Sequence, residues 1–366
     1  MAHARKTDVA MKGGGYYSLA TLGAKHVIEA ATPLVLDAIG AAMDHAQHEF
    51  TITDMGCADG GTSLTMIRAA IDAIRTVSSG LDVRIVYTDQ PRNDFNALFQ
   101  ILHGKTDFNS YLTDYQNLYV AASATSFYQQ MLPGGTLNLG FSATAMHWLS
   151  RKPGNISDHV HVVGASGEEL ATFSQQGRRD WETILLHRAA ELAPGGRLVL
   201  VNFARDKRGR HLGNTGGVHM FDTFNAIWQS FLDEGNISAD EYRNMTLPQY
   251  YNTVQEFSAP LLEKSSPVYA AGLRLEGIET RIVPCPFAAD FAIHGDSERF
   301  AREYIPTLRS WTEATFFDAL GKMRAIEERH ELIDRYYREY ESRVRDDPAG
   351  HAMDYVHAYM TVRREP

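Results

Sequence analysis

Apolar residues along the first two hundred positions change repeatedly between a helical spacing and a strand spacing. Apolar side chains recur every three to four residues over 19–46, 62–77, 93–102 and the segment that begins at Glu168. Short β-branched, aromatic and aliphatic runs lie between these segments, at 49–54, 83–89, 118–123, 136–143 and 197–203. Strands that alternate with helices in this way predict an α/β fold, in which a mostly parallel sheet carries helices on both faces.

The pattern changes after residue 205. Residues 205–217 are polar and glycine-rich, which predicts a loop. Most of the remaining chain has helical spacing, except for a strand-like run over 273–284 that we expect at the sheet edge. We therefore expect an α/β core over 1–205, a mainly helical substrate-binding cap over 206–345, and a C-terminal tail over 346–366.

The turn between the first strand and the next helix reads DMGCADGGTS, residues 54–63. Its glycines do not follow the G-x-G-x-x-G spacing, and no Lys-Ser or Lys-Thr pair follows them, so it is neither a dinucleotide fingerprint nor a P-loop. Asp54 and Asp59 would repel a pyrophosphate. A cationic ligand suits the turn better, and S-adenosylmethionine (SAM) carries a sulfonium, an ammonium and no phosphate.

A second acid, Asp89, ends the next strand along the chain. A carboxylate at that place can accept hydrogen bonds from both hydroxyls of a ribose. The run LAPGGRLVLVN (192–202) supplies a late strand of the same sheet. These features together predict a class I, Rossmann-like methyltransferase fold, and they disfavour the alternative of an NAD-dependent oxidoreductase.

The charge and the composition limit the kinds of molecule that we expect the protein to bind. The 366 residues carry 35 Lys and Arg against 45 Asp and Glu, a net charge of −10. This balance argues against nucleic acid, because phosphate binding needs a basic surface. No uncharged apolar run approaches the roughly 20 residues of a membrane span, the first residues do not resemble a signal segment, and Cys57 and Cys285 are too few for a disulfide framework. We expect a cytoplasmic protein that binds a small molecule.

Six segments occur in order along the chain: MKGGGYYS (11–18), DMGCADGGTS (54–63), TDQPRNDFNALF (88–99), SFYQQMLP (126–133), SATAMHWLS (142–150) and FDTFNAIW (221–228). Together they resemble the SABATH family of SAM-dependent carboxyl methyltransferases. The family methylates salicylate, benzoate, jasmonate and indole-acetate, and includes the N-methyltransferases of caffeine synthesis. The resemblance implies methyl-ester formation on a small carboxylic acid, S-adenosylhomocysteine (SAH) as the second product, an N-terminal segment 1–46 that gates the site, and a homodimer.

The resemblance also implies roles for the cofactor-binding residues. Ser18 would contact the region of the SAM carboxylate, Asp54 the methionine moiety and Asp89 the ribose, while Ser126 and Phe127 would flank the adenine. With the neighbouring turn residues, the implied cofactor set is Ser18, Asp54, Gly56, Asp59, Asp89, Gln90, Ser126 and Phe127.

The acceptor half of the site shows departures from the family. Trp148, with His147 beside it, would bind the substrate carboxylate. His26 lies where plant members carry a glutamine, so we interpret it as the substitute donor, and Thr144 replaces a usual aromatic residue. The whole substrate-binding set expected is Tyr17, His26, Thr144, His147, Trp148, Phe224 and Trp228. We expect no metal, since Asp222 and Asn225 match the family's metal position only loosely.

Carboxylate methylation explains why the sequence shows no catalytic triad. A carboxylate is already ionised near pH 7, so no general base is needed, and catalysis can come from orientation and from removal of water. His147, Trp148 and His26 are then the candidate catalytic residues. Two alternatives stay open at this point: N-methylation of a heterocycle, with a histidine as proton acceptor, and a SAM-binding protein without activity.

Overall fold

One sheet organises the chain. The computed structural model describes residues 18, 20–46 and 48–365. The strand order is β3-β2-β1-β4-β5-β8-β7, with β6 paired to β5 outside this path. The strands are β1 (Glu49–Met55), β2 (Asp82–Thr88), β3 (Leu118–Ser123), β4 (Leu137–Ala143), β5 (Leu192–Arg205), β6 (Asn252–Thr253), β7 (Leu273–Val283) and β8 (Tyr355–Arg364).

The strands β1 to β5 pair in parallel, whereas β8 runs antiparallel to both β5 and β7. The class I methyltransferase fold expected from the sequence is thereby confirmed, with a mostly parallel sheet and helices on both faces. The run expected as an edge strand over 273–284 coincides with β7, which is the last strand in the order.

Alternate residues of β5 show how the two faces of the sheet are covered. Val199, Val201 and Phe203 pack in the cluster that contains α2 (Leu22–Met43) and α3 (Leu64–Val77). Leu198 and Leu200 pack in a second cluster with α5 (Gly167–Glu191). Because successive strand side chains point to opposite faces, the two clusters lie on opposite sides of the sheet. α4 (Phe95–Leu102) follows β2.

Two short helices that we expected in the cap lie against the sheet instead. We assigned 206–345 to the cap, but α8 (Val254–Leu262) and α9 (Pro267–Ala270) pack against β7 and α5, so they cover the sheet. The apolar residues Leu261 and Val268 join the cluster of α5, which explains the position. The cap itself consists of α6 (Met220–Asp233), α7 (Ala239–Asn244), α10 (Pro286–His294), α11 (Ser297–Ala319) and α12 (Ile326–Asp346).

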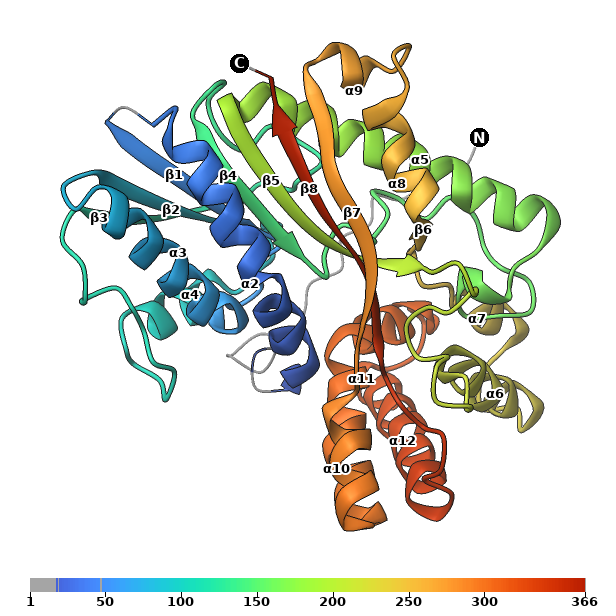
Figure 1. Cartoon of the computed structure of the whole chain (residues 1–366). Coiled ribbons are helices and arrows are strands. Elements are labelled where there is room, and N and C mark those ends of the chain that lie inside the picture. The colour runs from blue at the N-terminus through green and yellow to red at the C-terminus, as the bar shows by residue number, and fades with distance from the viewer. Residues whose placement is uncertain (1–17, 19, 47, 366) are drawn as a thin grey trace.

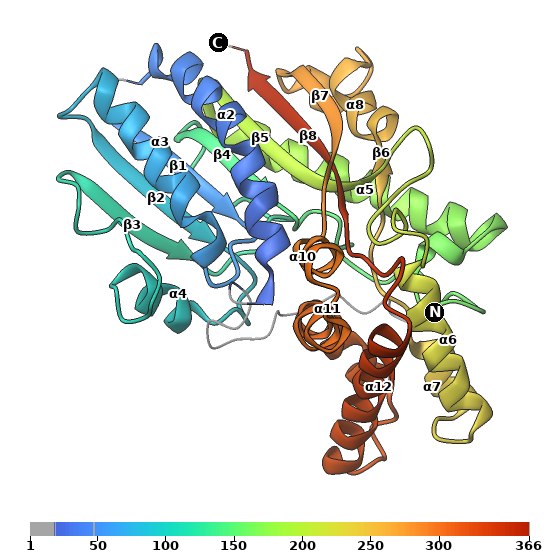
Figure 2. The ribbon, with the colours of Figure 1, turned by 60° about the horizontal axis from the view of Figure 1, so that its bottom comes forward.

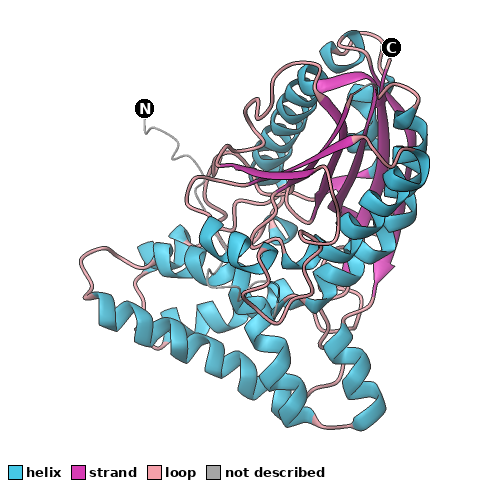
Figure 3. Cartoon of the chain, turned by 90° about the vertical axis from the view of Figure 1, so that its left-hand side faces the viewer, coloured by secondary structure: helices cyan, strands magenta, loops and turns pink. Residues whose placement is uncertain are grey.

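The cap lies below the sheet in Figure 1, and the long helices α11 and α12 pack against each other. Figure 2, in which the cap comes forward, shows α10 and α11 beside one end of α2. The hydroxyl of Thr307 on α11 donates to the carbonyl of Ala20, just before α2, which fastens the two parts together. Figure 3 shows the same division by colour, with the strands gathered in one layer and the cap helices in another.

The helix α2 has an apolar composition that needs an explanation. Within the described residues it is the one helix long and apolar enough to cross a membrane by length and composition. One of its faces is buried, including Val27, Ala31 and Val35, and it packs on β4, β5 and α3. This burial is typical of the core helix of a globular domain.

The C-terminal segment differs most from its expected structure. We expected 346–366 to form a tail, but residues 355–364 form β8, between β5 and β7. The run YVHAYMTV is rich in β-branched and aromatic residues, which favour strands, and Val356, Met360 and Val362 are fully or almost fully buried. The last strand of the chain is therefore an interior strand of the sheet.

A substitution in β8 tests this position. Met360 is 1% exposed and packs in the cluster with Leu200. We expect Met360→Ala to lower the free energy of unfolding by about 2–5 kcal/mol, because it removes buried methylenes and leaves a cavity. Urea unfolding measures this. Arg363→Ala in the same strand, where the side chain is 37% exposed, should change it by less than about 0.5 kcal/mol. Equal effects of the two substitutions would contradict an interior β8.

Candidate active site

A large cavity lies at the carboxyl ends of the parallel strands. The strand order reverses direction between β1 and β4, and such a reversal opens a crevice in which α/β proteins bind ligands. The cavity encloses about 820 Å³ of empty space, its opening to solvent included. Its lining residues are Thr21, Ala24, Gly56, Ala58, Asp89, Gln90, Phe127, Thr144, Ala145, His147, Trp148, Phe203, Trp311, Met353 and Tyr355.

Asp54 is the buried acid at the end of β1. It lines a smaller cavity that shares Ala24, Gly56 and Thr144 with the large one. The hydroxyl of Ser63 donates to its carboxylate over 2.6 Å. Burial and, to a smaller extent, the nearby charge of Asp89 nevertheless raise the pKa of Asp54 to about 6, against the lowering effect of Ser63. A cation that reaches Asp54 would restore its ionised form.

Glycine is required at position 56 for two reasons. Its φ is +79°, in the left-handed region that favours glycine. A Cβ there would also lie 2.4 Å from the Cβ of Ala145, so no side chain fits. The turn is held by the N–H groups of Gly56 and Cys57, which both donate to the carbonyl of Thr88 at the end of β2. Gly56 itself lines both cavities.

Asp89 lies in the wall of the large cavity. The backbone N–H of Ala58 donates to Oδ2 over 2.8 Å, and that of Gln90 donates to Oδ1 over 2.7 Å. Burial raises the pKa of Asp89, and these two donors oppose the rise. A carboxylate fixed in this way keeps further lone pairs that can accept hydrogen bonds from a ligand's hydroxyls.

Ser18 and Asp59 bind each other. The backbone N–H of Ser18 donates to Asp59 over 3.0 Å, and its hydroxyl donates to the same carboxylate. A Cβ on Gly61 would approach the Ser18 hydroxyl to 2.5 Å, so glycine makes room for this contact. Neither Ser18 nor Asp59 is among the residues that line the two cavities. In this structure the pair connects Ser18, which precedes α2 by four positions, to the glycine turn.

Phe127 lines the cavity, and a buried ion pair holds its loop. Arg188 and Glu191 on α5 are both fully buried and lie 2.7 Å apart. The guanidinium of Arg188 donates to the carbonyls of Phe127 and Gln129, and Glu191 accepts from the N–H of Met131. The side chain of Ser126 accepts from the N–H of Tyr128 and is not in the cavity wall. Sequence reasoning missed the ion pair, because its spacing is that of an ordinary exposed helix pair.

His147 and Trp148 follow β4 and both line the cavity. Their backbone is paired with the segment before β6: the N–H of Tyr250 donates to the carbonyl of His147, that of Leu149 donates to Pro248, and Trp148 forms a bridge with Gln249. These bonds hold the turn firmly. Burial, together with the neighbouring His357, lowers the pKa of His147 well below its usual value, so the ring is neutral near pH 7. Its Nδ1 atom is buried and has no hydrogen-bond partner.

The opposite walls come from distant parts of the chain. Phe203 is on β5, Trp311 is on α11, and Met353 and Tyr355 lie at the start of β8. Sequence reasoning missed all four, because no local pattern links strands and helices so far apart in the sequence. The aromatic spacing of β8 was the one feature of the sequence that could have indicated any of these residues. Among the described residues that line the large cavity, none is Lys or Arg.

Three expected substrate contacts have other positions. His26 is on α2 and is not among the residues lining either cavity. Phe224 and Trp228 on α6 are fully buried and pack on Phe316 and Tyr336 of α11 and α12. Their helical spacing places them in the core of the cap, which corrects our expectation. Tyr17 lies outside the described residues.

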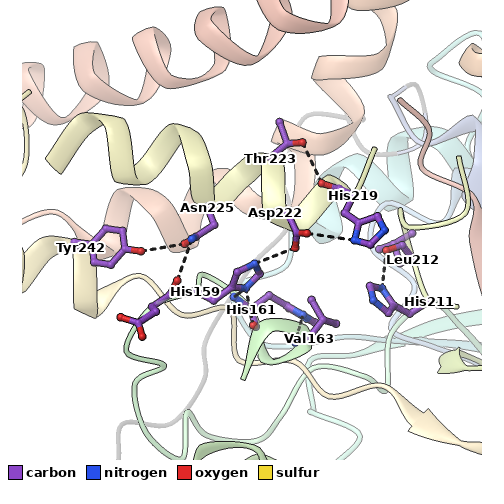
Figure 4. A network of polar contacts seen from close by, with 11 residues as sticks. His159, His161, Val163, His211, Leu212, His219, Asp222, Thr223, Asn225 and Tyr242 are labelled. Atoms are coloured by element: carbon purple, nitrogen blue, oxygen red, sulfur yellow. Dashed lines mark hydrogen bonds and ion pairs between the residues drawn. The ribbon is translucent and has the colours of Figure 1, made fainter. Parts of the chain in front are cut away.

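The region of Asp222 and Asn225 is shown in Figure 4. Asp222 lies between two histidines, 3.3 Å from Nε2 of His159 and 3.2 Å from Nδ1 of His219. The amide of Asn225 donates to the carbonyl of Asp158 and accepts from the hydroxyl of Tyr242. Within residues 18, 20–46 and 48–365, no group of three or more His, Cys, Asp or Glu side chains is arranged to hold a metal ion.

Comparisons with known proteins agree with this geometry. The family model described as SAM dependent carboxyl methyltransferase matches residues 6–365. Indole-3-acetate O-methyltransferase 1 of Arabidopsis thaliana is 28% identical over 227 residues, which are 57% of this chain and 59% of that protein, so the chain matches less than two thirds of its length. Salicylate carboxymethyltransferase of Clarkia breweri is 25% identical over 271 residues, covering 70% and 73% of the two chains.

A solved structure entitled loganic acid methyltransferase with SAH superposes with a TM-score of 0.77 over 97% of this chain and 99% of that one. The sequence identity in that superposition is 19%, so this likeness concerns the fold.

The pKa of Asp54 generates a prediction about cofactor binding. SAH carries an ammonium but no sulfonium, and the ionised form of Asp54 should bind it better. Because the pKa of Asp54 is about 6, the dissociation constant of SAH should be level above pH 7 and rise by up to about tenfold per unit below pH 6. Calorimetry between pH 5 and 8 measures this. The neutral His147 contributes no titration there.

Asp54→Asn is the matched variant. It should weaken SAH binding at pH 7 by about tenfold or more, the value of a hydrogen bond to a charged group, and make the dissociation constant independent of pH. Asp89→Asn should weaken binding but keep a pH-dependent dissociation constant, with the rise starting at a lower pH, because the charge of Asp89 contributes to the raised pKa of Asp54. A wild-type slope in Asp54→Asn would contradict the assignment.

Proposed function

Because the chain belongs to the family of SAM dependent carboxyl methyltransferases, we propose that its cavity holds SAM against Asp54 and Asp89 and methylates the carboxylate of a small organic acid. This was the family that the sequence motifs resembled, and the resemblance is confirmed. Membership also removes the alternative of an NAD-dependent oxidoreductase. The observation that supports a cationic cofactor best is a cavity with aromatic walls, two acids on the cofactor side and no Lys or Arg among its described lining residues. The matched family model supports a carboxylic acid as the substrate.

The residues present fit SAM as the cofactor. Asp54 is buried, and the groups that shift the pKa values of Asp54 and Asp89 include no Lys or Arg, so a cationic ligand would complete the site. Gly56, at which a Cβ would collide with Ala145, lines both cavities. Asp54 would hold the methionine moiety, Asp89 the ribose hydroxyls and Phe127 the adenine ring. When bound, SAM supplies an electrophilic methyl group on a positively charged sulfur.

The chain's own residues would orient the acid and exclude water. Trp148 carries an indole N–H, which can donate to one carboxylate oxygen while the other is left free to attack. His147 is neutral, so it cannot protonate the carboxylate and quench it. Phe203, Trp311 and Tyr355 surround the acceptor side with apolar surface, and attraction between opposite charges is stronger in such a medium than in water. Orientation and desolvation then account for catalysis without a general base.

One observation favours a second candidate, methyl transfer to a ring nitrogen. A nitrogen nucleophile that carries a proton must lose it, and His147, whose ring is neutral, is the one histidine among the described residues that line the large cavity. Carboxylate methylation remains the first candidate because the family model matched is that of carboxyl methyltransferases.

Cellular setting and assembly form part of the same proposal. A small-molecule acid as partner, rather than nucleic acid, agrees with the net charge of −10. A cytoplasmic location agrees with two cysteines that are both free. A homodimer is supported by the family resemblance.

Transfer from methyl-labelled SAM to a panel of acids tests the function. We expect label in organic-soluble, base-labile products from monocarboxylic acids with an aromatic or other apolar body. Dicarboxylic and tricarboxylic acids should react at least about tenfold more slowly, because a second carboxylate would lose its water without a cation to pair with. Base-stable label on nitrogen heterocycles would move the conclusion to N-methylation, and SAH binding without any transfer would support a protein without activity.

Substitution of Trp148 tests the acceptor side separately. Trp148→Phe keeps an aromatic ring but removes the N–H, so we expect KM for the acid to rise by about tenfold or more while the dissociation constant of SAH changes less than about twofold. Trp181→Phe is the matched control, because Trp181 is also buried and donates its N–H to the carbonyl of Phe257, outside the cavity. An unchanged KM in Trp148→Phe would show that the indole N–H does not bind the acid.

A further inference from the structure

Thr144 has an unusual backbone conformation at the centre of the site. It follows β4 and has a φ of +57°, which is rare for a β-branched residue and needs support from its surroundings. Its backbone N–H donates to the carbonyl of Val201 on β5 over 2.8 Å. Thr144 lines both the cavity that contains Asp54 and the cavity that contains Trp148, so it lies where the cofactor half and the acceptor half meet.

The side chain of Thr144 has one hydrogen-bond partner in the structure. Its Oγ1 atom lies 3.2 Å from Nε2 of His357, on β8. His357 is fully buried and does not line either cavity. It therefore acts on the site through Thr144 or through its other neighbours, and it is separated from Thr144 by more than two hundred positions in the chain.

Aromatic contacts fix the orientation of His357. It lies opposite Phe203 in the β5–β8 register, and the two ring centroids are 4.2 Å apart. Phe203 also contacts His147, with centroids 4.7 Å apart and the rings nearly perpendicular. Tyr355, two residues before His357 on the same strand face, stacks beside it at 5.8 Å. Burial lowers the pKa of His357 to about 3, so the ring is neutral and keeps one donor and one acceptor nitrogen.

From this geometry we propose that His357 is a positioning residue for the methyl transfer: its hydrogen bond with Thr144 fixes the turn 144–148 that presents the acceptor-binding side chains. The inference rests on the proposed function. The C-terminal strand thereby takes part in the reaction without touching the substrate. Without this hydrogen bond, nothing fixes the side-chain position of Thr144. The turn 144–148 would then present its side chains to the acid in a less precise orientation.

A double-mutant cycle tests the coupling between the two side chains. Thr144→Val keeps the branched shape and removes the hydroxyl, and His357→Leu removes the polar ring nitrogens. Each should lower kcat/KM for the acid by about tenfold, the effect of losing one buried hydrogen bond, with KM for SAM changed less than about twofold. The double variant should lose no more than either single variant, because both substitutions remove the same interaction.

Conservative and matched variants separate positioning from a general loss of structure. Thr144→Ser retains the hydroxyl and should recover most of the activity lost in Thr144→Val, as should His357→Gln relative to His357→Leu. Thr53→Val is the control for removal of a buried threonine hydroxyl, since Oγ1 of Thr53 has no partner and the residue is outside the cavities. A general structural defect would instead raise KM for both substrates and lower the melting temperature.

Two results would overturn the inference. One is a Thr144→Val enzyme with wild-type kcat/KM for the acid, and the other is a double variant whose losses multiply to about a hundredfold. Failure of the proposed function is seen earlier, in the wild-type enzyme. If the wild type methylates only ring nitrogens, the function is contradicted, and the same cycle with that acceptor then decides the inference.

Discussion

Two buried carboxylates at the ends of neighbouring strands determine what this site can bind. Asp54 lies at the end of β1 and Asp89 follows β2, these strands are paired along their whole length, and burial raises the pKa of both carboxyl groups. Ionised carboxylates in such a place are costly unless a partner compensates them. Neutral donors oppose the rise, but the described groups that shift these pKa values include no Lys or Arg, so a cationic cofactor would complete the compensation.

The acceptor side follows the same electrostatic logic. No Lys or Arg lines it in the described part of the chain, so the charge that balances an acid's carboxylate would be the positive charge of the cofactor itself. The two ligands would then bind as a pair of opposite charges inside aromatic walls, where attraction is least screened. The rigid backbone pairing of the His147–Trp148 turn and the clamp of Arg188 and Glu191 on the Phe127 loop supply the orientation that such a reaction needs.

Local patterns in the sequence identified part of the wall of the site and missed the rest. Among the expected cofactor residues, Ser18, Asp59 and Ser126 line neither cavity. Asp54, Gly56 and Asp89 lie at strand ends, where the change from strand to helical spacing fixes their place, and Phe127, His147 and Trp148 were identified through family motifs. Phe203, Trp311, Met353 and Tyr355 reach the cavity through tertiary packing alone. Phe224 and Trp228 show the opposite error, because they were expected in the site and pack inside the cap. Helical spacing identifies a buried face but not whether that face contacts a ligand or another helix.

The C-terminal strand shows why a chain end can be misread. Residues 355–364 follow a long helix, and no neighbouring segment of the sequence could pair with them as a strand, so we expected a tail. In the fold β8 lies between β5 and β7, and it brings Tyr355 to the cavity wall and His357 to Thr144.

A crystal structure of the enzyme with SAH and an acid that it methylates tests the central claim most directly. The account predicts the SAH amino group at Asp54, its ribose hydroxyls at Asp89, and the acid's carboxylate between the SAH sulfur and Trp148, with no Lys or Arg bound to it. An acid carboxylate paired with a basic side chain, or SAH bound away from the two acids, would contradict it.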